Sequence, residues 1–316
     1  MAWHMTSVIS PDLASIDMPL PVAVVCHDAG AANVLVAELA YQPTWTVLPV
    51  MHGPAVKVWR ASASESLPLL ELEAALARAR LVVTGTGWAS NLEHEARCRA
   101  IALRLPTVAV LDHWVNYRER FEHEGQVMLP DEIWVTDAYA LKIATDLFPS
   151  TIVRQRPNHY LRDQVSAIHR CGRVEAGRVL YVLEPLRYVW PGLTRAGEFE
   201  ALDYLIRRIK TLTGCVSPCL WLRPHPSEQL AKYQPWLGNH HGIEVAMDDS
   251  NSLADAIGRA EWVVGCETAA MVIALAAGKR VASTLPPAAP RCRLPHQGLV
   301  HLRDLAETGP QGANPG

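Results

Sequence analysis

The segment Cys219-Leu-Trp-Leu-Arg-Pro-His-Pro-Ser-Glu228 decides how the chain is interpreted. Its first four residues have the apolar pattern of a β-strand that runs into Arg223. Pro224 fixes its own φ angle and Pro226 disfavours the helical conformation at His225, so the backbone there should be extended and stiff. Ligands of open α/β sheets bind at the carboxyl ends of the strands. Arg223 and His225 are therefore predicted to bind a phosphate, the alternative being a proline-rich turn with a surface histidine.

The composition indicates a globular, core-rich protein of 316 residues, 49% apolar and 19% charged, which favours two domains. The net charge is −3 and there is no long run of lysine and arginine, so nucleic acid and anionic membranes are not expected as main partners. No apolar run reaches about 18 residues, so no transmembrane segment is expected.

The seven cysteines are an odd number scattered over the chain, several of them inside apolar patterns. This usage predicts reduced thiols in a cytoplasmic protein. Cys215 and Cys219 are the only close pair, and no second pair stands at zinc-site spacing, so no metal is expected.

The first half alternates short apolar strands with helical patterns, which predicts a doubly wound parallel sheet. The expected strands are 21–26, 45–50, 81–84, 107–111 and 132–136, and helices are expected at 34–40, 56–60, 67–80, 90–105 and up to Leu147.

A second series of the same kind follows a Pro-rich, charged segment that begins at Pro149. Its expected strands are 178–183, 219–223, 242–246, 261–265 and 279–283, with helices at 198–212, 252–260 and up to Ala277. We therefore expect an α/β protein with two Rossmann-like doubly wound domains, 20–150 and 175–305, joined by a linker region at 151–174. Such domains would place their strand exits face to face across a cleft.

Polar residues follow two of the buried strands in the first half. His27 and Asp28 follow the first, and Gly30 and Asn33 belong to the small-residue loop and helix start behind them. Backbone N–H groups at such a helix start can bind an anion. The alternative is that Gly30 only lets the helix pack close to the sheet.

Asp112 directly follows five strand residues and is the best candidate for a general base, with His113 beside it. Trp114 and Tyr117 are expected to form an apolar or stacking wall. The alternative is that Asp112 caps the next turn and Trp114 belongs to the core.

In the second half, Glu267 and Thr268 stand at the start of a very apolar helix, whose positive end suits a phosphate. The carboxylate of Glu267 could bind sugar hydroxyls or simply cap the helix. Glu184 follows another strand and is a weaker candidate for the same site.

The segment Gly85-Thr-Gly-Trp-Ala-Ser90 follows a strand and opens a helix, with Thr86 between its glycines. Ser90 and Glu93 have the spacing of a capping box. The pattern approaches a dinucleotide fingerprint, which leaves an NAD-dependent oxidoreductase or a nucleotide-binding module as an alternative.

With its Arg-Pro-His-Pro strand exit and its late Glu267-Thr-Ala-Ala helix, the chain resembles the GT-B glycosyltransferases. The dipeptide His225-Pro226 is similar to the HP motif of the bacterial sialyltransferases of that group and of their relatives among Kdo, polysialic acid and CDP-glycerol transferases. The resemblance implies that His225 contacts the donor phosphate and that Asp112 deprotonates the acceptor. Asp112-His-Trp keeps only one acid of the sialyltransferases' acid-pair-and-glycine motif, and Thr268 alone matches their late serine/threonine pair.

The expected function is therefore an inverting glycosyltransferase of glycan or natural-product biosynthesis. It would use a CMP-, UDP- or CDP-activated sugar and an acceptor hydroxyl, with no cofactor. A nucleotide-sugar 2-epimerase or hydrolase of the same fold is the alternative.

Overall fold

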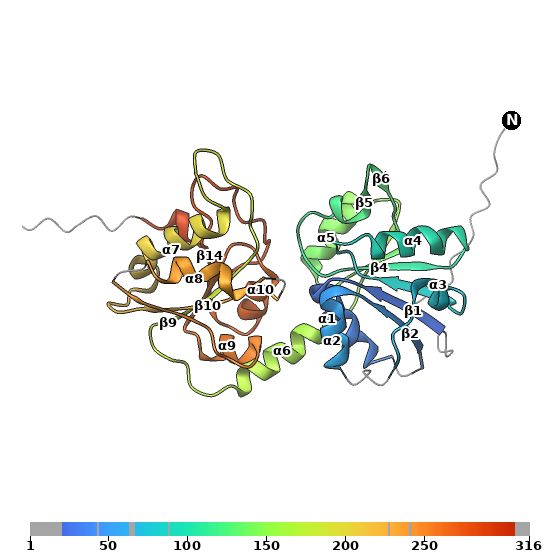
Figure 1. The fold of residues 1–316 in the computed structure, drawn as a ribbon, viewed down its shortest axis with the longest axis horizontal. Helices are drawn as coiled ribbons and strands as arrows, with labels where there is room; N and C mark the ends of the chain where they lie inside the picture. The colour runs from blue at the N-terminus through green and yellow to red at the C-terminus, as the bar shows by residue number, and fades with distance from the viewer. Residues whose placement is uncertain are drawn as a thin grey trace, which may run out of the picture. The chain divides into compact units, whose positions relative to one another are not determined.

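The computed structural model describes residues 21–42, 44–62, 67–87, 89–226, 228–239 and 242–306. The chain divides into two compact units, Met1–Tyr160 and Leu161–Gly316, shown in Figure 1. The boundary falls inside helix α6 (His159–Arg170), within the segment expected as the linker.

Unit 1 is built on a six-stranded parallel sheet with the order β2-β1-β3-β4-β7-β8. The strands are β1 (Pro21–Cys26), β2 (Thr46–Met51), β3 (Leu81–Thr84), β4 (Thr107–Leu111), β7 (Glu132–Val135) and β8 (Ile152–Gln155). The helices are α1 (Ala29–Leu39), α2 (Gly53–Arg60), α3 (Leu72–Leu76), α4 (Leu92–Ala102) and α5 (Ala138–Leu147). A short antiparallel hairpin, β5 (Glu122–His123) and β6 (Gln126–Val127), follows a 3-10 turn, η2 (Glu119–Phe121).

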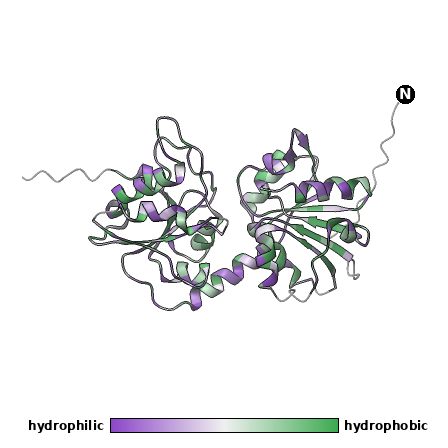
Figure 2. Ribbon diagram, in the orientation of Figure 1, coloured by the Kyte–Doolittle hydropathy of each residue, from purple (hydrophilic) through white to green (hydrophobic). Residues whose placement is uncertain are grey.

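Alternate residues of β1 enter two separate cores, because successive side chains of a strand point to opposite faces. Val22, Val24 and Cys26 pack in the core that includes residues of α1 and α2. Ala23 and Val25 pack in the core that includes residues of α3 and α4. Helices thus cover both faces of the sheet, and this is why its central strands β1, β3 and β4 are buried and mostly hydrophobic (Figure 2).

Unit 2 is built on a second six-stranded parallel sheet with the order β11-β10-β9-β12-β13-β14. The strands are β9 (Arg178–Val182), β10 (Cys219–Arg223), β11 (Glu244–Met247), β12 (Trp262–Gly265), β13 (Arg280–Ser283) and β14 (Leu299–His301). The helices are α7 (Gly197–Thr213), α8 (Gln234–Leu237), α9 (Leu253–Arg259) and α10 (Ala269–Ala276), with 3-10 turns η3 (Leu230–Tyr233) and η4 (Leu302–Asp304). In chain order the strands lie 3-2-1-4-5-6, the order of a dinucleotide-binding Rossmann sheet.

The predicted fold class is confirmed: both units are doubly wound parallel α/β structures. Three local predictions are wrong. The helix expected at 67–80 is only the five-residue α3. Residues 152–155, expected in the linker, form β8, which pairs with β7 in the first sheet. Ser90 and Glu93 form no capping box, because Ser90 Oγ accepts from the Leu92 N–H and the Glu93 carboxylate lies elsewhere.

Each sheet has one point where the strand order reverses direction, and ligands of open α/β sheets bind there. In unit 1 the chain runs from β1 to β2 on one side and returns to β3 on the other, so the reversal lies between β1 and β3. In unit 2 it lies between β9 and β12. These two strand edges are the places to look for function. Among the described residues, no helix is long and apolar enough to cross a membrane.

Candidate functional site

The reversal point of the unit 2 sheet brings together two carboxylates that are 83 positions apart in the sequence. Glu184 follows β9 and Glu267 follows β12, and the N–H of Glu267 donates to Glu184 Oε2 at 2.9 Å. Both residues were predicted from the sequence as parts of a binding site, and the structure places them in direct contact.

Burial raises the pKa of the Glu184 carboxyl to about 7, and the nearby Glu267 carboxylate acts in the same direction. The hydrogen bond from the Glu267 N–H and the charge of Arg293 act against this rise. Glu184 is therefore poised to gain or lose a proton near neutral pH, which is typical of groups at functional sites.

Glu267 does not cap α10, so the capping alternative is wrong. Thr268 is the N-cap, and its Oγ1 accepts from the Ala270 N–H at 3.4 Å. The Glu267 carboxylate is instead held by Arg293, whose backbone N–H and Nε donate to Oε2 at 3.1 and 3.3 Å and whose Nη2 donates to Oε1. Arg293 lies in the segment between β13 and β14, and nothing in the sequence singled it out.

Arg223, at the end of β10, is engaged by other protein groups. Its Nη1 donates to Asp248 Oδ2 at 2.5 Å and to the Ser250 carbonyl at 3.2 Å. Asp248 is fully buried and also accepts from Arg178 Nη2 at 3.1 Å. The arginine therefore ties β10 to the segment after β11, and a phosphate would have to share its guanidinium with Asp248. The phosphate role of Arg223 stays a prediction.

His225 is partly buried in the loop that leaves β10. Its carbonyl accepts from the Glu228 N–H at 2.9 Å, which closes a tight turn. The Glu228 carboxylate is nearly buried and is paired with Arg187 at 2.5 Å and with Lys232. The loop that carries His225 is thus anchored through Glu228, and it leaves the sheet one strand away from the reversal point.

In unit 1, Asp112 lies at the exit of β4, and its side chain is 8% exposed. Arg120 Nη1 donates to its Oδ1 at 3.2 Å. A Cβ on Gly30 would come within 2.2 Å of its Oδ2, so this oxygen lies directly against the first turn of α1. Gly30 is therefore required because a side chain there would collide with the Asp112 carboxylate. The glycine thus permits close packing, and the group that packs against it is itself a candidate site residue.

Another carboxylate, that of Glu93, lies beside the reversal point of unit 1. It is fully buried, and its Oε1 accepts from the His27 N–H at 2.7 Å. Burial raises its pKa, and its interaction with Arg97 acts against that rise. The sequence pointed to Glu93 only as a helix cap, because its partner is 66 positions away.

The two glycines of Gly85-Thr-Gly are close to protein atoms. A Cβ on Gly85 would lie 2.9 Å from Ala31 Cβ, and one on Gly87 would lie 3.0 Å from Asp28 Cβ. Both would also approach Glu93 Oε1, at 3.4 and 3.3 Å. This packing accounts for the glycines without a dinucleotide. Trp88 of the same motif lies outside the described residues.

Three further candidate residues of unit 1 are buried, and two of them form hydrogen bonds to other protein groups. Thr86 is buried, and its Oγ1 donates to the Val110 carbonyl at 3.0 Å. Trp114 is buried and donates to Asp137 Oδ2 at 2.7 Å, as its core alternative predicted. Tyr117 is only 2% exposed, and burial raises its pKa.

Three more site residues predicted from the sequence lie on segments that follow β1 and β4. Asp28 is the N-cap of α1, and its Oδ1 accepts from the Gly30 N–H at 3.4 Å. The His113 ring packs 5.6 Å from the Trp114 ring, centroid to centroid. Asn33 is partly buried within α1. The described residues contain no group of three or more histidine, cysteine, aspartate or glutamate side chains placed to hold a metal ion.

No protein family and no curated protein match this sequence. Solved structures do match it. The chain is similar to the UDP-GlcNAc 2-epimerase from Neisseria meningitidis bound to UDP-GlcNAc, with a TM-score of 0.56, 10% identity and coverage of 83% of this chain and 82% of that one. It is also similar to a putative UDP-N-acetylglucosamine 2-epimerase from Listeria monocytogenes, with a TM-score of 0.55, 13% identity and coverage of 83% and 78%. The glycotransferase of kitacinnamycin matches with a TM-score of 0.48, 14% identity and coverage of 86% and 82%.

At these identities the likeness shows the fold alone. The fold is that of the GT-B class, whose two doubly wound domains are shared by glycosyltransferases and nucleotide-sugar epimerases. This confirms the GT-B part of the resemblance seen in the sequence. The closer resemblance to the HP-motif transferases stays a prediction.

Proposed function

We propose that this protein is a glycosyltransferase that moves a sugar from a nucleotide-activated donor to an acceptor hydroxyl. The observation that carries the proposal is the unit 2 strand edge. There Glu184 and Glu267 meet at the reversal point of a sheet with Rossmann strand order, next to the N-cap Thr268 of α10. His225 leaves the neighbouring strand β10.

Each of these groups suits one part of a nucleotide. The N–H groups in the first turn of α10 and the ring of His225 can donate to phosphate oxygens, and the helix end adds partial positive charge. The Glu267 carboxylate can accept from ribose hydroxyls, for which it would exchange part of its contact with Arg293. Glu184, whose pKa is about 7, can be neutral near a phosphate and so avoid repelling it.

In the proposed reaction, the Asp112 carboxylate accepts the proton of the acceptor hydroxyl as its oxygen attacks the anomeric carbon. The bond between that carbon and the donor phosphate oxygen breaks, and its electron pair leaves with the nucleotide phosphate. Attack from the opposite side inverts the anomeric centre. Donors that are already oriented toward the leaving phosphate supply the main stabilisation.

The test is product analysis by mass spectrometry after incubation with CMP-, UDP- and CDP-sugars, with and without a mixture of sugar acceptors. The proposal predicts a glycosylated acceptor, formed only when acceptor is present. Release of free sugar in the absence of acceptor would mean a hydrolase.

A nucleotide-sugar 2-epimerase is the second candidate. It is favoured by the structural matches above a TM-score of 0.5, which include UDP-GlcNAc 2-epimerases. Its signature would be conversion of UDP-GlcNAc to the 2-epimer without acceptor, with uptake of solvent deuterium at C2. Appearance of that label would replace the transferase assignment with the epimerase.

A further inference from the structure

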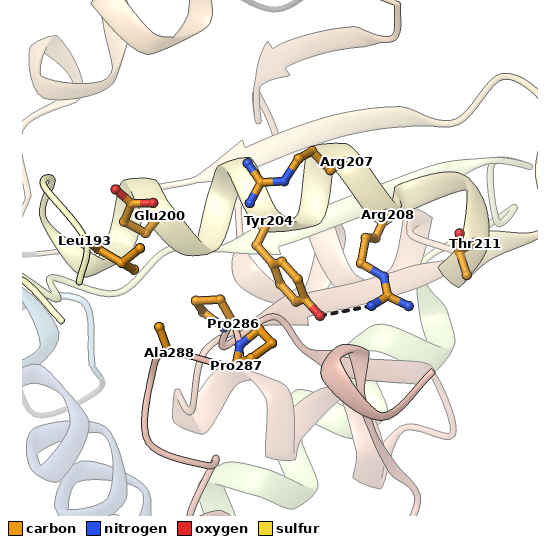
Figure 3. Close-up of a pocket in the computed structure, with 9 residues that line it drawn as sticks. All are labelled: Leu193, Glu200, Tyr204, Arg207, Arg208, Thr211, Pro286, Pro287 and Ala288. Carbon is orange, nitrogen blue, oxygen red and sulfur yellow. Dashed lines mark hydrogen bonds between the residues drawn. The ribbon is translucent and has the colours of Figure 1, made fainter. Parts of the chain in front are cut away.

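A depression of about 540 Å³ runs along α7 in unit 2, away from the residues proposed to bind the donor (Figure 3). Its lining residues come from one side of α7, the segment before it and the segment after β13, and include Leu193, Glu200, Tyr204, Arg207, Pro286 and Pro287. None of Glu184, His225, Glu267 or Thr268 is among them. The volume lies within the range of about 300 to 1,000 Å³ that is usual for small-molecule sites.

The wall opposite α7 is held rigidly in place. Arg303 Nε donates to the Leu285 carbonyl at 3.1 Å, and its Nη2 donates to the carbonyls of Pro286, Ala289 and Pro290. Arg291 and Asp304 form a two-pronged ion pair, with distances of 2.7 and 3.1 Å. This wall, with its two consecutive prolines, is therefore formed before any ligand arrives.

The polar groups along α7 are arranged to receive an anion. Arg207 is exposed, and no group in the described parts of the chain forms a hydrogen bond or ion pair with its guanidinium. The Tyr204 hydroxyl accepts from Arg208 Nη1 at 3.1 Å, which leaves its own hydrogen available for donation. Figure 3 shows the Tyr204 ring reaching toward the proline wall from the helix.

The other end of the depression offers a different chemistry. Glu200 supplies carboxylate oxygens that can accept from hydroxyl groups, and it is only loosely paired with Arg195 at 3.6 Å. Leu193 and the two prolines give apolar surface between the two ends. The depression thus combines a cation and an acceptor on one side of α7 with an apolar wall opposite them (Figure 3).

We propose that this depression is a second ligand site, which binds a small sugar carrying a phosphate or carboxylate group. The anionic group contacts Arg207, and a face of the sugar ring lies against Pro286 and Pro287. Ring hydroxyls donate to Glu200, and one accepts from the Tyr204 hydroxyl. A charge-assisted hydrogen bond to arginine is among the stronger polar contacts and supplies most of the discrimination against neutral sugars.

The test is calorimetric titration of the full chain with glucose 6-phosphate, glucuronate, glucose and inorganic phosphate. Glucose 6-phosphate or glucuronate should bind with a dissociation constant below about 1 mM, and glucose and inorganic phosphate should each bind at least tenfold more weakly. Which of the two anionic sugars binds tighter distinguishes a phosphate ligand from a carboxylate ligand.

Arg207→Gln should weaken binding of the anionic sugar about tenfold or more, and Tyr204→Phe should weaken it less. Lys210→Gln is the matched control, because it removes the same charge from an exposed position of α7 that does not line the depression. His225→Ala should leave the affinity unchanged, which separates this site from the proposed donor site. Thermal melting of each variant verifies that it is folded.

The proposal is overturned if no anionic sugar binds, if Arg207→Gln and Lys210→Gln have the same effect, or if His225→Ala abolishes binding. Binding of inorganic phosphate as tightly as the better of the two anionic sugars would also overturn it, because the ring would then contribute nothing. None of these outcomes depends on whether the protein transfers a sugar.

Discussion

Replacing Glu184 with glutamine should stabilise the protein, and the gain should grow as the pH rises. The structural reason is that burial raises the pKa of this carboxyl from an ordinary value of 4.5 to about 7. The folded protein binds this proton more tightly than the unfolded chain does, so ionisation of Glu184 disfavours folding. The penalty is absent below pH 4.5, grows between pH 4.5 and 7 and is constant above that range.

The size of the penalty follows from the two pKa values. A pKa difference of one unit corresponds to about 1.4 kcal/mol, so the full penalty is about 3 kcal/mol above pH 8 and about 1 kcal/mol at pH 5. Glutamine has no charge to bury, and its Oε1 can still accept from the Glu267 N–H. The gain in unfolding free energy of Glu184→Gln over the parent should therefore be about 2 kcal/mol larger at pH 8.5 than at pH 5.

The measurement is urea-induced unfolding of the parent and the variant, followed by circular dichroism at several pH values between 5 and 8.5. Subtracting the two free energies of unfolding at each pH cancels every titrating group except Glu184. Glu244→Gln is the matched control, because it makes the same change at an exposed position of unit 2 and should show no pH trend. A difference between parent and Glu184→Gln that stays constant with pH, or that falls as pH rises, would show that Glu184 does not carry a raised pKa in the folded protein.

Three further outcomes are expected. Gly30→Ala should displace Asp112 Oδ2, which would lie 2.2 Å from the new Cβ, and should cost about 1–3 kcal/mol of unfolding free energy by urea titration; an unchanged stability would show that the carboxylate moves aside freely. Glu267→Gln should release Arg293 and blur the preference among donor sugars while costing at most about 1 kcal/mol of stability, since the Arg293 side chain is 49% exposed; an unaltered preference would reduce Glu267 to a partner of Arg293. Nucleotide affinity by calorimetry should increase as the pH falls through 7, because protonation of Glu184 removes a negative charge beside the phosphate site; affinity that is flat with pH would place the phosphate elsewhere.

The sequence predicted the fold well because its strands are buried on both sides and therefore apolar without interruption. The apolar composition of Val22–Cys26 and Val179–Val182 is enough to identify both segments as buried strands. Within the two parallel sheets, the strands that were missed, β8 and β14, are short edge strands and are half-exposed, so their sequences carry no such signal.

The candidate site was predicted less completely, because side-chain partners are set by tertiary contacts. Glu93 has the right spacing to reach Ser90, but the buried His27 N–H takes its carboxylate instead. Arg223 stands at a strand exit, as expected, but it pairs with Asp248 at the exit of the neighbouring strand β11. This pairing could not be predicted, because a sequence does not show which strands are neighbours. The partners of Glu184 and Glu267 were likewise invisible, although strand-exit position alone nominated both acids.

Under the proposed function, unit 2 binds the nucleotide of an activated sugar and Asp112 of unit 1 acts only in the chemical step. Calorimetry with the preferred nucleotide, combined with turnover of the corresponding donor, tests it on the parent, His225→Ala and Asp112→Asn. His225→Ala should weaken nucleotide binding and lower turnover, because the phosphate that His225 contacts is already present in the ground state. Asp112→Asn should bind nucleotide like the parent and lose about 10²- to 10⁴-fold in turnover, the usual contribution of a positioned base. Loss of nucleotide binding in a folded Asp112→Asn variant, with binding intact in His225→Ala, would instead place the nucleotide site in unit 1.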